Sequence, residues 1–398
     1  MSDPTRLQAV DVERDSAKLT QTHLDFMRRL EKENVNRVLK LRAIRRKNIL
    51  TGALLGVRAQ KKLSQNFLLD PAIINRFVSK ARVAGCHVVE VGPGPGSLTR
   101  AILQLQPRSL TVIEKDERFL PLLESLADTC VNEDGRMRIV HDDILTFDMG
   151  SLGIPTEVRR DWNNRELPDI SLIGNLPFSI ATRLVINWLF DIATRRGPWE
   201  YGRVPMVLSF QEEVAQRIVA EPGTENRSRL SVMCQAFCDV RYGMTIRGGS
   251  FVPAPDVDAG IVVFTPRATP LVPVEEFGFP FFERVVRDIF NCKKKDFRKG
   301  VKNLIPEKLH EILLPEIVAR AGIEVDLECS GPIYLTVSDF GRIASAIKEL
   351  HVAIPELAKY DFRSARTTRT NGEELLPRVE RFLRDGWNAG GPLSAFAV

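Results

Sequence analysis

Residues 87–103, HVVEVGPGPGSLTRAIL, decide how we expect this chain of 398 residues to fold. The β-branched run His87–Val91 predicts a strand, and Ser97–Leu103 predicts a helix. The turn between them, Gly92–Gly96, contains three glycines, which let a backbone turn tightly and approach a ligand closely. A strand, a glycine-rich turn and a helix in this order are typical of a βαβ unit that binds a nucleotide-like cofactor.

Acidic residues follow the next two predicted strands. Glu114 comes directly after the apolar run Leu110–Ile113, about twenty residues past the glycines, where an acid suits a bidentate grip on ribose hydroxyls. Asp142 and Asp143 follow the run Met137–Val140, and a carboxylate at this place can accept a hydrogen bond from an adenine amine. The three acids therefore predict a nucleoside-binding edge of the sheet.

The glycine turn and an acid do not identify the cofactor alone, because nicotinamide dehydrogenases use the same two elements. The spacing here is G-x-G-x-G with two prolines, whereas the pyrophosphate fingerprint is G-x-G-x-x-G. A cofactor without phosphates fits this spacing better. We therefore favour S-adenosylmethionine, and a methyltransferase over a dehydrogenase.

A second motif supports this choice. The apolar run Ile170–Gly174 predicts a buried parallel strand, and Asn175-Leu176-Pro177-Phe178 follows it. The Asn175 side-chain oxygen and the Leu176 carbonyl can both accept hydrogen bonds from one exocyclic amine. Pro177 fixes the backbone that carries them, and Phe178 offers a flat face for a base. The alternative is a strand that simply ends in a turn, and the upstream glycine motif makes it the weaker interpretation.

An ordered set of motifs closely resembles the ribosomal RNA adenine dimethyltransferases, the KsgA and Erm group. The resemblance covers about residues 59–350, and Tyr201-Gly202-Arg203 with the Trp162-bearing insertion is similar to the mitochondrial branch, also called mitochondrial transcription factor B. It implies a Rossmann-like class I S-adenosylmethionine-dependent methyltransferase sheet with a small C-terminal helical domain. The motifs are Gln65–Leu68, Glu90–Thr99, Ile113–Asp116, Asn175–Phe178, Ser209–Arg217, Arg227–Val232 and Phe251–Asp258.

The resemblance also implies roles for single positions. The cofactor-binding set it implies is Gln65, Asn66, Leu68, Gly92, Gly94, Glu114, Lys115, Asp143 and Asn175. The catalytic set it implies is Asn175, Leu176, Pro177 and Phe178, with Phe178 stacked on the target adenine and Phe251 flanking it. Asp142 departs from the family pattern, which has a small residue there, so either aspartate can be the adenine ligand, and we favour Asp143.

The residue types predict a reaction without a tuned general base. Two acceptors can draw the amine hydrogens out of the ring plane, and positioning and fixed dipoles then provide most of the catalysis. A methylated, positively charged amine sheds its proton readily. His87 and His141 lie beside predicted strands, and we expect them to be structural. We expect no metal site.

Composition sets the remaining bounds. The length suits two domains with extensions, and a hydrophobic content of 44% with 27% charged residues is that of a soluble globular protein. The net charge of +5 permits a nucleic-acid partner. The sequence has no apolar run near 18 residues, so we expect no transmembrane helix. The six cysteines form no CxxC pair, which favours a reducing compartment, and we expect Cys234 and Cys238 to be buried free thiols.

We expect four segments: a basic N-terminal extension (1–58), the methyltransferase domain (59–268), a helical substrate-binding domain (269–362) and a polar C-terminal tail (363–398). The extension is a targeting sequence, an RNA-binding helix or a solvated helix, and its acidic front does not suit a transit peptide. Two local expectations are a strand within the run Met233–Ile246 and an N-cap at Ser338.

The densest basic run begins with Lys293, Lys294 and Lys295. It is either a solvated helix face or a surface that follows RNA phosphates, and we favour the second because the run opens the domain that would face the substrate. The target base must be splayed from its loop to reach Phe178.

We therefore predict dimethylation of the N6 amines of two adjacent adenosines in the 3′-terminal hairpin of mitochondrial small-subunit rRNA, in support of ribosome assembly. The expected partners are that rRNA or the assembling small subunit, and possible further partners are the mitochondrial transcription machinery; the expected place is the mitochondrial matrix, and we expect no membrane partner. One alternative is a non-catalytic transcription or assembly factor that binds nucleic acid with the same fold. Another is a DNA adenine methyltransferase, which more often has an acid where this chain has Asn175.

Overall fold

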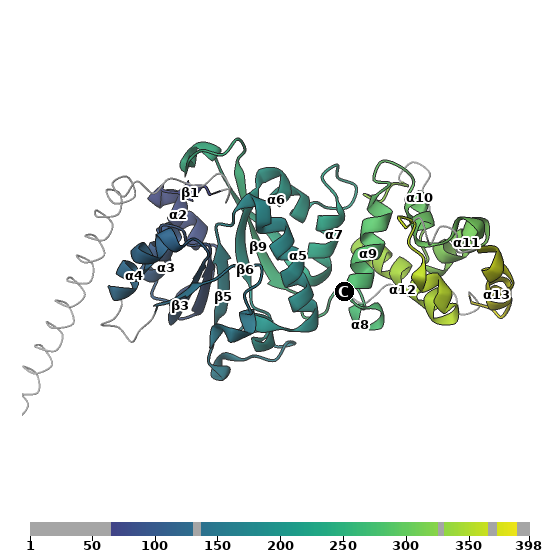
Figure 1. Ribbon diagram of the computed structural model, residues 1–398, viewed down its shortest axis with the longest axis horizontal. Helices are drawn as coiled ribbons and strands as arrows, with labels where there is room; N and C mark the ends of the chain where they lie inside the picture. The colour runs from purple at the N-terminus through teal and green to yellow at the C-terminus, as the bar shows by residue number, and fades with distance from the viewer. Residues whose placement is uncertain (1–64, 130–136, 325–329, 365–371, 388–398) are drawn as a thin grey trace, which may run out of the picture. The chain divides into compact units, whose positions relative to one another are not determined.

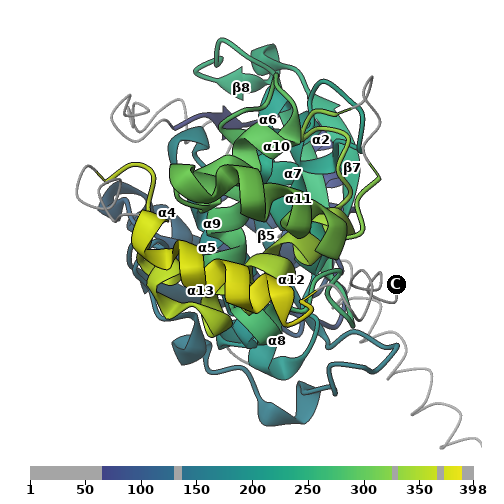
Figure 2. The ribbon, with the colours of Figure 1, turned by 90° about the vertical axis from the view of Figure 1, so that its right-hand side faces the viewer.

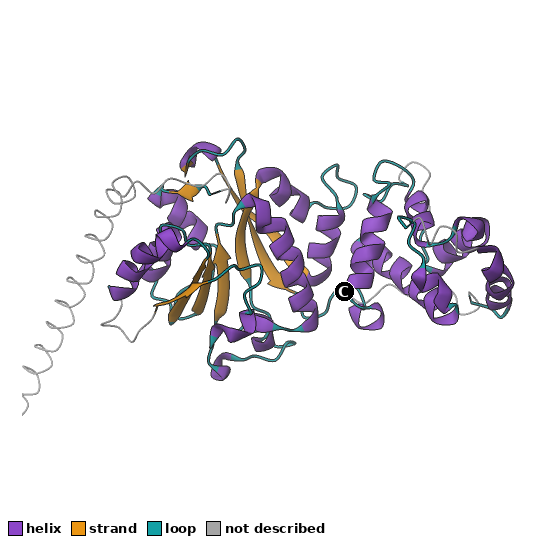
Figure 3. Cartoon of the chain, in the orientation of Figure 1, coloured by secondary structure: helices purple, strands orange, loops and turns teal. Residues whose placement is uncertain are grey.

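A computed structural model describes residues 65–129, 137–324, 330–364 and 372–387 of the chain. The predicted N-terminal extension lies outside these residues, as do residues 365–371 and 388–398 of the predicted tail. The described residues form a strand-rich part and a helical part (Figures 1 and 3), and one hydrophobic core extends through both.

The centre of the strand-rich part is a seven-stranded sheet with the order β4-β3-β2-β5-β6-β9-β7. The first five strands in this order are parallel, whereas β9 runs antiparallel to both β6 and β7. Their bounds are β2 His87–Val91, β3 Ser109–Glu114, β4 Met137–His141, β5 Ile170–Gly174, β6 Met206–Gln211, β7 Cys238–Ile246 and β9 Ala259–Pro266.

The middle of this sheet explains where a ligand can bind. Every residue of β2 and β5 is buried, as expected for central parallel strands covered on both faces. The chain passes from β2 outward to β3 and β4 and then returns to β5 on the other side of β2, so the strand order reverses between them. Val91 pairs with Gly174 at the carboxyl ends of the two strands, and open α/β sheets bind ligands at such a point.

Helices cover both faces of the sheet, as Figure 3 shows. Asp70 is the N-cap of the first of these helices, α2, because its side chain accepts hydrogen bonds from the amides of Ala72 and Ile73. The helix α5 begins at Phe178, so the tetrapeptide Asn175–Phe178 connects β5 directly to it. The bounds are α2 Pro71–Val78, α3 Ser97–Gln104, α4 Leu120–Asp128, α5 Phe178–Thr194, α6 Glu212–Val219 and α7 Arg229–Phe237.

A second, two-stranded sheet consists of β1 Phe67–Leu68 and β8 Phe251–Val252. Phe67 pairs with Val252 and Leu68 with Phe251, in antiparallel register. This small sheet joins the segment 65–68, which we call the strap, to a loop that is far away in the sequence.

The helical part follows β9, which pairs antiparallel to β6 and therefore ends at the sheet edge opposite to the carboxyl end of β5. The amphipathic α9 packs on α7 and leads the chain to the loop between α6 and α7. Figure 2 shows the helical part from the front. The bounds are α8 Val274–Phe277, α9 Phe279–Phe290, α10 Phe297–Val301, α11 His310–Arg320, α12 Val337–Ala353 and α13 Gly372–Arg384.

The structure corrects three expectations. Residues 233–237 of the predicted strand belong to α7, and only Cys238–Ile246 is a strand. Thr336, and not Ser338, caps α12: its hydroxyl accepts from the Asp339 amide while the Asp339 carboxylate accepts from the Thr336 amide. The predicted polar tail contains the helix α13, which buries Leu375 and Val379.

Cys234 and Cys238 are buried free thiols, as predicted. Among the described residues, no helix combines the length and the apolar character that crossing a bilayer requires.

Candidate active site

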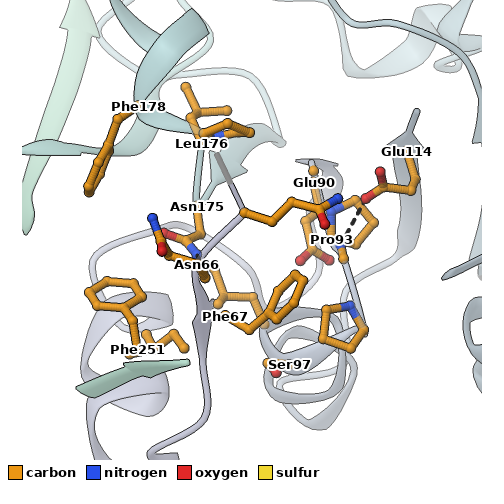
Figure 4. A pocket seen from close by; sticks show the side chains of 17 residues that line it. Asn66, Phe67, Glu90, Pro93, Ser97, Glu114, Asn175, Leu176, Phe178 and Phe251 are labelled. Atoms are coloured by element: carbon orange, nitrogen blue, oxygen red, sulfur yellow. Dashed lines mark hydrogen bonds between the residues drawn. The ribbon is translucent and has the colours of Figure 1, made fainter. Parts of the chain in front are cut away.

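A pocket opens at the carboxyl ends of β2 and β5, between the glycine turn, the strap and the start of α5 (Figure 4). Eleven predicted site residues line it: Gln65, Asn66, Leu68, Gly92, Gly94, Glu114, Asn175, Leu176, Pro177, Phe178 and Phe251. Residues from five distant parts of the chain therefore meet in one place.

The glycine turn lines the half of the pocket that the sequence predicts to hold a cofactor; we call it the cofactor half, and we call the half around Asn175–Phe178 and Phe251 the target half. Gly92, Gly94 and Gly96 have φ values of 66°, 54° and 80°, which other residues rarely adopt. A Cβ on Gly94 would lie 3.2 Å from the Phe67 ring of the strap, and one on Gly96 would lie 2.6 Å from Leu126. Glycine is therefore required both for the turn and for the close approach of the neighbouring segments.

Glu114 is fixed by backbone groups. Its two carboxylate oxygens accept hydrogen bonds from the amides of Gly94 at 2.9 Å and Asp116 at 2.8 Å. Burial raises the pKa of Glu114, although these backbone hydrogen bonds act in the opposite direction. The carboxylate thus faces the glycine turn in one defined orientation, with lone pairs left for further donors.

Two predicted cofactor ligands, Lys115 and Asp143, do not line the pocket. Lys115 Nζ donates to Asp143 at 2.7 Å, and this contact is the main reason that the pKa of Asp143 is lowered. The second Asp143 oxygen accepts from the Leu145 amide, and the Asp142 carboxylate accepts from the Asp143 amide. Asp142 therefore orients the turn at Asp143, which is a local structural use of this residue.

The strap is attached to the pocket on several sides. Gln65 Nε2 donates to Asp116 at 2.8 Å, and the Phe67 ring contacts Phe119 edge to face. The Asn66 carbonyl accepts from Asn175 Nδ2 at 3.2 Å. The Asn66 carboxamide, oriented so that its nitrogen donates, reaches the Pro253 carbonyl at 3.0 Å. These contacts join the cofactor half of the pocket to the target half.

The target half contains two acceptors and two rings. Asn175 and Leu176 follow the last residue of β5, and Figure 4 shows the rings of Phe178 and Phe251 on the same side of Asn175. Phe251 is buried, at 2% exposure, whereas Phe178 is only half-buried. The arrangement can hold a flat ring and accept hydrogen bonds from an amine at its edge.

The sequence reasoning missed two polar residues of the site. Ser209, on β6, is fully buried, and its Oγ lies 2.9 Å from Asn175 Oδ1. Glu90, on β2, lines the pocket at 1% exposure, and its Oε2 has no hydrogen-bond partner among the described residues. Burial raises the pKa of Glu90 to about 8, and the charge of Glu114 acts in the same direction. The sequence signal that could have identified both residues is a polar residue inside an otherwise apolar strand.

The basic run lies outside the pocket lining. Lys293 Nζ donates to the Glu225 carbonyl at 2.9 Å, so this residue connects the helical part to the loop between α6 and α7. Lys294 and Lys295 are exposed. The two predicted structural histidines have local partners: His87 Nδ1 lies 2.7 Å from Ser109 Oγ, and His141 Nε2 lies 3.2 Å from the Lys115 carbonyl.

Comparisons with known proteins agree with this geometry. Residues 56–326 match the family model described as ribosomal RNA adenine dimethylase. The chain is 40% identical over 322 residues to the Homo sapiens protein named dimethyladenosine transferase 1, mitochondrial, covering 81% of this chain and 90% of that protein. It is also 40% identical over 319 residues to the Bos taurus protein of that kind, covering 80% and 90%.

One solved structure is similar along most of the described chain. A dimethyladenosine transferase from Plasmodium falciparum has a TM-score of 0.50 and 21% identity, covering 72% of this chain and 97% of that chain. This likeness concerns the fold. It agrees with the α/β, Rossmann-like sheet predicted from the sequence.

Proposed function

The chain belongs to the ribosomal RNA adenine dimethylase family, and from this we propose that it dimethylates the N6 amines of two adjacent adenosines in the 3′-terminal hairpin of mitochondrial small-subunit rRNA. It is a methyltransferase that uses S-adenosylmethionine, as the spacing of the glycines predicted. The single observation that supports the chemistry best is the pair of acceptors at Asn175 and Leu176 beside two aromatic rings.

The residues of the cofactor half fit S-adenosylmethionine. The glycine turn leaves room that a Cβ would fill, and the fixed Glu114 carboxylate can accept hydrogen bonds from ribose hydroxyls. The Glu90 oxygen without a partner, Oε2, suits a positively charged group, because a buried carboxylate oxygen that lacks a donor is costly. We propose that the strap residues Gln65, Asn66 and Leu68 contact the methionine end.

Asp143 is the proposed ligand of the cofactor adenine, with Lys115 holding its carboxylate. The pair lies beyond the pocket lining, at the end of β4, so this assignment rests on the family pattern and on the neighbouring position of β3 and β4.

S-adenosylmethionine supplies, when bound, an electrophilic methyl group on a sulfonium centre. The Asn175 oxygen and the Leu176 carbonyl accept hydrogen bonds from the target amine. These bonds draw the amine hydrogens from the ring plane, which makes the nitrogen lone pair available. We propose that Phe178 and Phe251, whose rings lie on the same side of Asn175 in Figure 4, hold the target base between them. Preorganised acceptors and a fixed base provide the rate, and the proton passes to these acceptors or to water.

The RNA is held by charge as well as by stacking. We assign Lys294 and Lys295 to phosphate contacts, since both are exposed on a loop of the helical part. Lys293 has a structural contact with Glu225, and its remaining donors can still reach a phosphate. The proposed place of action is the mitochondrial matrix, where the modification would support assembly of the small ribosomal subunit.

Depletion of the protein followed by mapping of methylated adenosines in mitochondrial and cytosolic ribosomes tests this proposal. We expect two adjacent adenosines of the mitochondrial small-subunit rRNA to lose both methyl groups. A loss confined to cytosolic rRNA would contradict the compartment. Unchanged methylation in both ribosomes would contradict the activity.

A further inference from the structure

Ser209 is a buried hydroxyl in an apolar strand. It lies on β6 between Leu208 and Phe210, and all three side chains have an exposure of 0%. A hydroxyl in such a place is costly unless its hydrogen-bonding capacity is used. Both contacts of Ser209 Oγ lead to the target half of the pocket: the Leu176 amide donates to it at 2.9 Å, and it lies 2.9 Å from Asn175 Oδ1.

The direction of each hydrogen bond follows from the chemistry of the groups. The Leu176 amide can only donate, so Ser209 Oγ accepts from it and keeps its own hydrogen for Asn175 Oδ1. At the other end of the carboxamide, Asn175 Nδ2 donates to the Asn66 carbonyl, which can only accept. A rotated carboxamide would place two oxygens against each other there. The orientation of Asn175 is therefore determined at both ends.

We propose that Ser209 is a positioning residue for methyl transfer, whose hydroxyl holds Asn175 Oδ1 and the backbone of Leu176 in the arrangement that accepts the target amine. An amide oxygen has two lone pairs, so one remains for the amine after Ser209 has used the other. Acceptors that are fixed in advance do not have to reorganise during the reaction, and this is the main source of electrostatic catalysis. The inference rests on the proposed function.

The test compares Ser209→Ala and Ser209→Thr with Ser171→Ala in the full chain. Ser171 is a matched control: it is equally buried, lies on the neighbouring strand β5, and its Oγ has no hydrogen-bond partner among the described residues. The measurements are kcat and KM for methyl transfer to a hairpin RNA, the Kd for S-adenosylmethionine, and Tm. Ser209→Thr keeps the hydroxyl, so it separates loss of the hydrogen bonds from a change in packing.

We expect Ser209→Ala to lower kcat by about 10- to 100-fold, the usual cost of removing a group that orients a directly acting one. The Kd for S-adenosylmethionine and the KM for the hairpin RNA should stay within about threefold of the wild-type values. Ser209→Thr should keep most of the rate. Ser171→Ala should leave kcat unchanged. Equal kcat values for Ser209→Ala and Ser171→Ala would overturn the inference, whereas a wild-type protein without methyl transfer to RNA would overturn the proposed function instead.

Two further variants cover the case in which Ser209→Ala does not fold well: Ser209→Cys alone and Ser209→Cys combined with Asn175→Ala. Ser209→Cys nearly preserves the volume and replaces the hydroxyl with a weak donor, so it should lose rate in the same direction. In an Asn175→Ala background, Ser209→Cys should cause a clearly smaller loss than in the wild type, because only the Leu176 backbone is then left for it to position. Independent, multiplying losses would contradict the coupling.

Discussion

The cofactor half and the target half of the pocket are built in different ways. The cofactor half uses backbone groups: three glycines at positive φ, and amides that hold the Glu114 carboxylate. The target half uses the Asn175 side chain, which is held by Ser209 and Asn66 from two other segments. The glycine turn and Glu114 of the first half lie within about thirty consecutive residues, whereas the contacts of Asn175 exist only after distant parts of the chain have packed together.

This difference predicts how each half should fail. Changes in the target half should lower the rate of transfer while the cofactor still binds, and changes in the cofactor half should alter cofactor affinity or stability. The predictions below test that division, and they begin with the largest effect.

Asn175→Ala should lower kcat by about 100- to 1,000-fold, the cost of removing one preorganised polar group from a transition-state site. The fold should remain, because the side chain lies at the pocket surface and not in the core. Single-turnover methyl transfer and Tm measure the two effects. Asn187→Ala, an exposed position on α5, is the control. Near-normal turnover of Asn175→Ala would exclude the proposed mechanism.

Glu90→Gln should change the pH dependence of stability without the cofactor. The raised pKa means that folded Glu90 keeps its proton up to about pH 8, whereas the unfolded residue loses it near its ordinary value of 4.5. The stability that Glu90 contributes is thus complete below pH 4.5 and is lost as the pH rises through about 8.

The free energy of unfolding of the wild type should therefore fall, relative to Glu90→Gln, by about 3 kcal/mol between pH 4.5 and pH 8.5, less than the full shift implies because the surroundings of an ionised carboxylate relax. Urea titrations at the two pH values measure this difference, and Glu124→Gln on the exposed face of α4 is the control. Parallel pH profiles for wild type and Glu90→Gln would contradict the raised pKa of the buried Glu90.

Phe178→Ala should weaken binding of a target hairpin by about 1–3 kcal/mol, the usual value of one base-stacking contact. Phe178→Tyr retains a flat ring and should bind nearly as well as the wild type. The affinity for S-adenosylmethionine should not change, since the ring belongs to the target half. Equal RNA affinities for Phe178→Ala and the wild type would argue against stacking.

Charge reversal at Lys294 and Lys295 should have the smallest effect at physiological salt and the clearest effect on salt dependence. Each lost phosphate contact lowers the slope of log K against log salt by roughly one unit. Fluorescence titrations of the hairpin at several salt concentrations measure that slope, and Lys359→Glu, also exposed, is the control. An unchanged slope would favour the alternative interpretation, in which the basic run is a solvated surface that does not contact RNA.

The sequence predicted the strands and the turn of the glycine motif well because their signals are local. The predicted strand at 87–91 and the glycine turn have the expected bounds, and the strand predicted at 110–113 extends by one residue at each end. The pattern failed at α7, where six of nine residues are buried, because a helix that is apolar on most sides lacks the periodicity that separates it from a strand.

The second kind of failure concerns pairing. Nothing in the local sequence indicates that Ser209 contacts Asn175 or that Lys115 holds Asp143, because these contacts join elements that meet only in the folded sheet. The helix α13 is a different case: Leu375, Leu376 and Val379 repeat at helical spacing, so a signal was present in the segment that we assigned to a polar tail.

The return path of the chain after β9 has a further consequence. The polypeptide leaves the sheet at the end away from the pocket. The twelve-residue α9 then spans roughly 18 Å in the opposite direction before the loop with Lys293, Lys294 and Lys295 begins. The length of α9 therefore sets the distance between that end of the sheet and the loop that carries Lys294 and Lys295, and a helix one turn shorter would reduce it by about 5.4 Å. If these lysines contact RNA phosphates as proposed, the length of α9 also sets how far from the modified nucleotide the RNA is held, although no residue of α9 lines the pocket.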